Sequence, residues 1–184
     1  MKSNALLFLN LISIFWCFGQ NVTPEDLNFK LNEDKTVIWK KHFKYEASKD
    51  DLKMILQSFL KNNVFTRKLN MTDDGFSGQS TKIFLSSTKS MAIGARNPYC
   101  ANIEIIVKDD QYSVSVTDIV FDGVQLDYPL IGKRPSHVPP LLLKDFVVKK
   151  KKFEFRKNNG AMSHLRVLNK DFNNYFTLNS AIEN

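Results

Sequence analysis

The sequence predicts a single α+β domain in which an antiparallel sheet carries helices on one face. Two apolar runs, residues 101–107 and 112–121, flank the polar turn 108–111, and the second run alternates apolar with polar residues as a half-buried strand does. Residues 52–60 and 165–176 carry apolar side chains at helical spacing. One face of the sheet is therefore expected to be wet, and the two amphipathic helices are available to cover the other.

Composition and length exclude a disordered, low-complexity or fibrous chain. Of the 184 residues, 43% are hydrophobic and 24% are charged, which is typical of globular proteins. The chain has 15 Phe, 5 Tyr and 2 Trp against only 7 Gly and 6 Pro, so it can build a core from bulky side chains. A domain of this size needs neither disulfides nor a metal for stability, and we expect no cofactor.

Residues 1–19 predict a cleavable secretory signal peptide. Lys2 precedes an apolar stretch at 5–18, which is shorter than the roughly 20 residues that span a bilayer. Small residues at Cys17 and Gly19 occupy the positions that a signal peptidase reads, so we expect cleavage after Gly19. The alternative is an uncleaved membrane anchor. We expect an exported protein, whether periplasmic, envelope-associated or secreted, with no transmembrane segment after cleavage.

Cleavage would leave Cys100 as the remaining cysteine, so no internal disulfide is expected. Cys100 lies beside an apolar run and has no basic neighbour, which predicts a buried, inert thiol.

A polar lead-in is expected at 20–35, and a single domain at 36–184. Residues 36–46 alternate as a first strand. A helix should follow Ser48, a typical N-cap with a carboxylate three residues later, and should end near Asn62 and Asn63. Its predicted buried stripe comprises Leu52, Ile55, Leu56, Phe59 and Leu60.

The rest of the chain is predicted to alternate short strands with turns and to close with a helix. Glycine and proline mark the loops, and periodicity marks the helix. The expected elements are strands at 64–71 and 78–87, a turn at 72–75, the hairpin, an extended loop at 122–140, a strand at 149–157, a turn at 158–160 and a helix that begins near Ser163.

A particular order of motifs runs through residues 36–125. A strand bearing Trp39 and a helix start at Ser48 precede a strand that runs from Tyr112 to Ile119. This order resembles the exported Bacteroidetes domain of unknown function that has a TBP-like fold. The resemblance implies secretion and a curved antiparallel sheet with helices packed on one face. It implies no activity and carries over no catalytic residues.

No catalytic or metal-binding motif is apparent. His42, His137 and His164 stand far apart and lack a second ligand at helical or loop spacing. The sequence contains no nucleophile elbow, phosphate loop or dinucleotide fingerprint. We therefore expect no metal site and no nucleophilic catalysis.

The strongest charge feature is a basic segment near the C-terminus. It comprises Lys149, Lys150, Lys151, Lys152, Arg156 and Lys157. Such a patch attracts anions, although a strand would point alternate lysines to opposite faces, so that about half could contact one partner. Protection of a sheet edge is the favoured explanation, with anion binding as the alternative. The interleaved Phe153 and Phe155 are expected to point into the core.

These observations favour a non-enzymatic binding or structural domain of the periplasm or cell envelope. Its partner would be another envelope protein or an anionic envelope component, and export argues against nucleic acid. One alternative is an uncharacterised secreted hydrolase, whose acid and base would come from Glu104, Asp118 and Asp122, although carboxylates at strand surfaces are common. The other is an anion-binding surface protein that uses residues 149–152.

Overall fold

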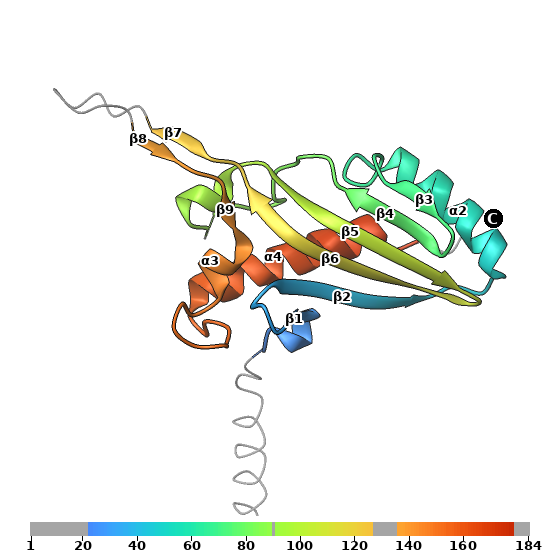
Figure 1. Ribbon diagram of the computed structural model, residues 1–184, viewed down its shortest axis with the longest axis horizontal. Coiled ribbons are helices and arrows are strands. Elements are labelled where there is room, and N and C mark those ends of the chain that lie inside the picture. Colours follow the sequence, from blue (N-terminus) through green and yellow to red (C-terminus); the bar gives the residue numbers. More distant parts are fainter. Residues whose placement is uncertain (1–21, 90, 127–135, 179–184) are drawn as a thin grey trace, which may run out of the picture.

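The computed structural model describes residues 22–89, 91–126 and 136–178 (Figure 1). The predicted signal peptide lies outside these residues, as does much of the loop predicted at 122–140. Every named strand pair is antiparallel. The larger sheet has the order β1-β2-β6-β5-β4-β3, and β9 also pairs with β6. Its strands are β1 (Phe29–Leu31), β2 (Val37–Lys44), β3 (Asn70–Thr72), β4 (Gly75–Gln79), β5 (Tyr99–Lys108), β6 (Gln111–Phe121) and β9 (Leu141–Leu142).

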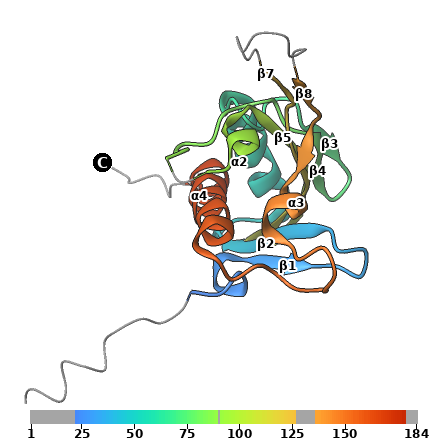
Figure 2. The ribbon, with the colours of Figure 1, turned by 90° about the vertical axis from the view of Figure 1, so that its left-hand side faces the viewer.

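A second, two-stranded sheet and several helices complete the described part of the fold. The small sheet pairs β7 (Val124–Leu126) with β8 (Ser136–Val138). The helices are the 3-10 turns η2 (Glu25–Leu27) and η3 (Ile93–Arg96) and the α-helices α2 (Lys49–Asn62), α3 (Leu143–Val147) and α4 (Asn159–Phe176). Helices α2 and α4 lie on the same face of the long, curved strands (Figure 2). The predicted fold class, an α+β domain with a curved antiparallel sheet and helices on one face, is confirmed.

Aromatic side chains join the sheet to α4. Trp39 of β2 is fully buried, and its ring centroid lies 5.2 Å from that of Phe172 and 6.0 Å from that of Phe176. Its indole Nε1 donates a hydrogen bond to Asn169 Oδ1 at 2.9 Å. Tyr112 of β6 donates through its hydroxyl to the carbonyl of Phe176 at 2.6 Å. The helix is thus held at several points along its length by both packing and satisfied polar groups.

The predicted hairpin and the first helix are confirmed. Strands β5 and β6 meet at a two-residue turn in which Asp110 adopts a positive φ of 57°, a conformation that aspartate tolerates better than most residues. Ser48 caps α2 by accepting a hydrogen bond from the backbone nitrogen of Asp51. The buried line of α2 is narrower than predicted, because Ile55 is 36% exposed and the buried residues follow a spacing of four: Leu52, Leu56 and Leu60. Asn63 ends the helix in an extended conformation rather than a left-handed one.

The stretch between α2 and the hairpin differs from the predicted strands. Residues 63–68 form turns, in which Asn63 Oδ1 accepts from the backbone nitrogen of Phe65, so the expected strand shrinks to β3. Strand β4 begins at Gly75, inside the predicted turn. A side chain at Gly75 would meet the carbonyl oxygen of Ile105 at 2.0 Å, so glycine permits the close pairing of β4 with β5.

The segment predicted as a polar lead-in contributes to the sheet. Within it, η2 leads into β1, which pairs with β2, and Phe29 is fully buried. The pairing partner lies in another part of the chain, so a local pattern of polar residues does not reveal it. The loop predicted at 122–140 likewise contains β7 and β8, which pair across the residues between them.

Two predictions near the C-terminus are wrong. Residues 149–157 form a loop that is closed by a single bridge between Val148 and Phe155, not a strand. Helix α4 begins at Asn159 instead of near Ser163, because Asn158 caps it by accepting a hydrogen bond from the backbone nitrogen of Ala161 at 2.9 Å. The asparagines predicted as a turn are thus the start of the helix.

Candidate functional site

The basic segment forms a closed loop between α3 and α4, which we call the lysine loop (residues 148–158). Its base is fastened by backbone hydrogen bonds: Lys149 N donates to Glu154 O at 3.0 Å, and Arg156 N donates to Val147 O at 2.7 Å. Arg156 Nε also donates to Val148 O at 3.0 Å. Phe155 is 7% exposed and anchors the loop in the core, as predicted. Residues 150–153 form the tip of the loop, where the chain bends without pairing to a strand.

All six predicted anion-binding residues line one open hollow. Its volume is about 610 Å³, and its lining consists of Lys149, Lys150, Lys151, Lys152, Arg156, Lys157 and Asn158. The expectation that only about half of the lysines could contact one partner followed from a strand. A loop that turns back on itself removes this restriction, because its side chains no longer alternate between two faces.

Most of the cations of the lysine loop form no ion pair with an acidic residue among those that the structure describes. Lys149 forms an ion pair with Glu154, with 2.7 Å between Nζ and Oε1. That hydrogen bond, together with the charges of Lys149, Lys152 and Lys157, lowers the pKa of the Glu154 carboxyl. Lys150, Lys151, Lys152 and Lys157 are exposed and form no ion pair within the described ranges. The hollow therefore has an excess of positive charge, which an anion would neutralise.

A second hollow, which we call the groove, lies between the lysine loop and the N-terminal end of the described chain. Its volume is about 810 Å³, and Lys157 lines both it and the first hollow. Figure 2 shows the lysine loop, in orange, running beside β1 and η2, in blue. The apolar residues that line the groove are Val22, Pro24, Leu31, Phe153, Phe155 and Met162. Phe153 is 50% exposed, so the expectation that it points into the core is wrong.

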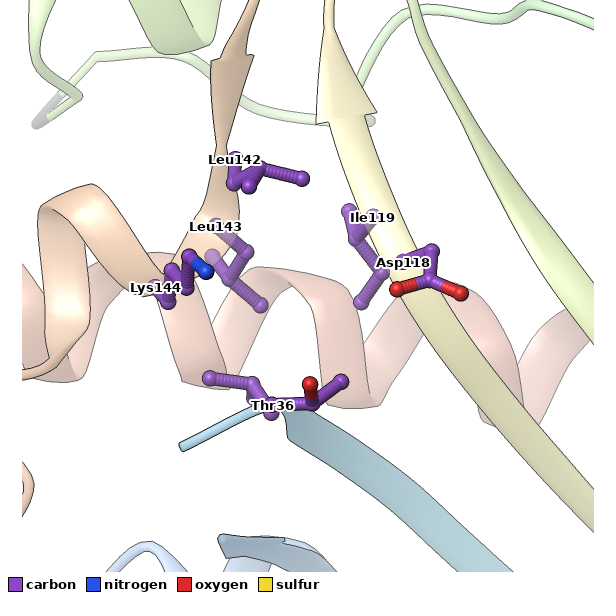
Figure 3. Close-up of a pocket in the computed structure, with 7 residues that line it drawn as sticks. Thr36, Asp118, Ile119, Leu142, Leu143 and Lys144 are labelled. Atoms are coloured by element: carbon purple, nitrogen blue, oxygen red, sulfur yellow. The ribbon is translucent and has the colours of Figure 1, made fainter. Parts of the chain in front are cut away.

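A third hollow lies where β6 changes neighbours (Figure 3). Strand β2 pairs with β6 as far as Val116, and β9 pairs from Val120 onward. Between them Asp118 adopts a positive φ of 48° at an irregularity in the pairing with β5. The space holds about 30 Å³, which suits about one water molecule. Asp118 Oδ2 accepts a hydrogen bond from Asn102 Nδ2 at 2.9 Å, so the carboxylate is bound to a side chain of β5.

The three carboxylates considered for acid and base catalysis have separate surroundings. Asp118 borders the small hollow just described, whereas Glu104 lines a different one beside β4. Asp122 is paired with Lys82, with 2.8 Å between Nζ and Oδ1. The three carboxylates thus differ in the hollow or partner that each contacts: Asp118 contacts Asn102, Glu104 lines the hollow beside β4, and Asp122 pairs with Lys82.

The other candidate residues also have separate surroundings. His42 is exposed on β2, His164 is buried in α4, and the side chain of His137 lies outside the described part of the structure. No group of three potential metal ligands occurs among the described residues. Cys100 is buried, and burial raises the pKa of its thiol, so it is poorly suited to act as a nucleophile. None of the helices in the described ranges is long and apolar enough to cross a bilayer.

Comparisons with known proteins concern the fold. Neither the protein-family models nor the curated proteins give a match. Among solved structures, a TBP-like protein from Parabacteroides distasonis ATCC 8503 is similar, with a TM-score of 0.48 and 17% sequence identity. The alignment covers 77% of this chain and 88% of that chain.

Proposed function

We propose that this protein is an exported, non-enzymatic domain that binds an anionic component of the cell envelope through the lysine loop. The observation that carries the proposal is the single hollow lined by all six cations of the basic segment. Only Lys149 among them is paired with a carboxylate in the described structure. Export is supported by the signal-peptide pattern of residues 1–19.

The side chains of the lysine loop suit a partner with several negative charges. Lysine presents a compact charge on a flexible stem, so neighbouring lysines adapt to phosphates in more than one arrangement. Each close pair of opposite charges contributes about 1 kcal/mol in bulk water, and salt screens it. Several such pairs are needed for useful affinity, and the open hollow offers four exposed lysines. The start of α4 at Asn159 adds the partial positive charge of a helix N-terminus.

The proposal is tested by co-sedimentation with vesicles of phosphatidylglycerol and, separately, of phosphatidylcholine. We expect binding to the anionic vesicles alone. The triple variant K150Q/K151Q/K152Q should weaken it at least about tenfold at low salt, because three of the exposed charges are lost. Lys149 is left in place because its ion pair with Glu154 closes the base of the loop.

The matched control is K40Q/K44Q/K108Q, which removes three exposed lysines from β2 and β5 and changes the net charge equally. This control should retain most of the binding. Equal losses in the two triple variants would show that net charge, not the lysine loop, attracts the vesicles. Export is tested separately by N-terminal sequencing of protein from intact cells: a cytosolic protein that begins at Met1 would contradict it.

A further inference from the structure

We infer that the groove holds the apolar chain of a single-chain amphiphile whose anionic head binds in the lysine loop. The inference rests on the proposed function and specifies the class of ligand. It starts from the fact that Lys157 lines both the hollow and the groove, so one molecule can reach from one to the other.

The groove is lined by apolar residues interspersed with charged ones. Phe155 and Met162 are 7% and 6% exposed and therefore present only small parts of their surfaces to it. Phe153 and Val22 stand at its edge, with 50% and 38% of their surfaces exposed. Covering the exposed part of Phe153 with hydrocarbon would remove apolar surface from water.

The charged residues around the groove favour a ligand that carries a negative group. The cations of the groove are Lys30, Lys157 and Arg166, and its acids are Glu25 and Glu154. Glu154 is already paired with Lys149, so it does not balance the three cations. The positive hollow adjoins the groove at Lys157. This distribution matches a molecule with an anionic head and a neutral chain.

The size of the groove favours a small ligand over a macromolecule. Its volume of about 810 Å³ falls within the range of about 300–1,000 Å³ that is common for small-molecule sites. A single-stranded nucleic acid would need successive aromatic platforms. The lysine loop offers one exposed ring, because Phe155 is buried.

Calorimetric titration with two probes separates the contribution of the ligand's anionic head from that of its alkyl chain. The probes are inorganic pyrophosphate and dodecyl phosphate below its micelle concentration. The full chain should bind dodecyl phosphate at least about tenfold more tightly than pyrophosphate. Phe153→Ser should remove most of that difference and leave pyrophosphate binding unchanged, whereas K150Q/K151Q/K152Q should weaken both. The matched control is Phe84→Ser, since Phe84 is 62% exposed and lies outside the groove.

A site-specific readout accompanies the titration. In Phe153→Trp, the emission that exceeds that of the wild type should shift to the blue with dodecyl phosphate and stay unchanged with pyrophosphate, and the wild type, which contains Trp39, should show no such shift. All variants begin at the same residue, so any contribution of the chain before Val22 is common to them.

Each other outcome overturns the inference in a recognisable way. If pyrophosphate binds and dodecyl phosphate binds no more tightly, the proposed function stands and the amphiphile is excluded. If neither binds, both proposals fail. Binding of a single-stranded oligonucleotide that exceeds that of dodecyl phosphate and needs Phe153 would identify a nucleic-acid site instead. A dimer in sedimentation that Phe153→Ser dissociates would identify a second copy of the chain as the occupant.

Discussion

At the scale of single residues, the polar groups of α4 show how closely the helix is fitted to its surroundings. Asp171 is 1% exposed and accepts a hydrogen bond from the backbone nitrogen of Ser86 at 3.0 Å, which ties a loop to the helix. His164 is 3% exposed and stacks on Phe146 of α3, with 5.3 Å between ring centroids. Its Nδ1 lies 2.6 Å from the carbonyl oxygen of Gly160, so the neutral ring donates there through Nδ1.

The burial of His164 predicts that acid destabilises the fold. Burial lowers the pKa of His164 below its ordinary value, despite the hydrogen bond to Gly160. The unfolded chain therefore binds a proton at a higher pH than the folded one, so stability is lost as the pH falls from the unfolded pKa of about 6.5 toward the folded value. Urea unfolding of wild type and His164→Phe across this range measures the effect. The variant should show a smaller dependence on pH.

The control for this prediction is His42→Phe, which removes an exposed histidine from β2. The larger reduction in pH dependence should belong to His164→Phe. If His164→Phe keeps the full dependence on pH, another group is responsible.

At the scale of elements, the helices agree best with the sequence because their signals are local. Periodicity placed the buried faces of α2 and α4, and Ser48 marked the start of α2. The start of α4 was missed because Asn158 and Asn159 are as typical of turns as of helix caps. The lysine loop was mistaken for a strand because alternating charged and aromatic residues also occur on sheet edges.

The cap of α2 makes a quantitative prediction. Ser48→Ala removes the acceptor for the backbone nitrogen of Asp51 and should lower the free energy of unfolding by about 1 kcal/mol. Ser58→Ala is the control, because Ser58 is exposed within the same helix, where alanine has the higher helix propensity. Urea denaturation should show a loss only for the first variant. Equal midpoints for the two variants would indicate that the cap contributes little.

At the scale of the whole molecule, the sheet begins earlier in the chain than the predicted domain. Strand β1 pairs with β2 at its edge of the larger sheet and brings Phe29 into the core. The same segment places Val22 and Leu31 along the groove. The core and the proposed binding site therefore both depend on residues that the sequence predicts to be a polar lead-in.

This arrangement predicts that Phe29 is essential for stability. Phe29→Ala should lower the free energy of unfolding by about 3 kcal/mol or more, since it removes a fully buried ring and leaves a cavity in its place. Val22→Ala, at a residue that is 38% exposed, should change it by less than about 0.5 kcal/mol. Thermal or urea unfolding distinguishes the two. A Phe29 variant as stable as the Val22 variant would show that β1 is dispensable and that residues 20–35 are a lead-in after all.

Local patterns were sufficient to predict the fold class and the β5–β6 hairpin and to locate the six cations of the basic segment. Periodicity, capping and charge runs are properties of neighbouring residues, so they can be recognised in the amino-acid order. Three features depend on segments that are distant in the chain: the pairing of β1 with β2, the gathering of all six cations around one hollow, and the groove between residues 22–31 and 153–166. Each arises from packing between parts of the molecule that meet only on folding. For that reason, no local sequence pattern predicts it.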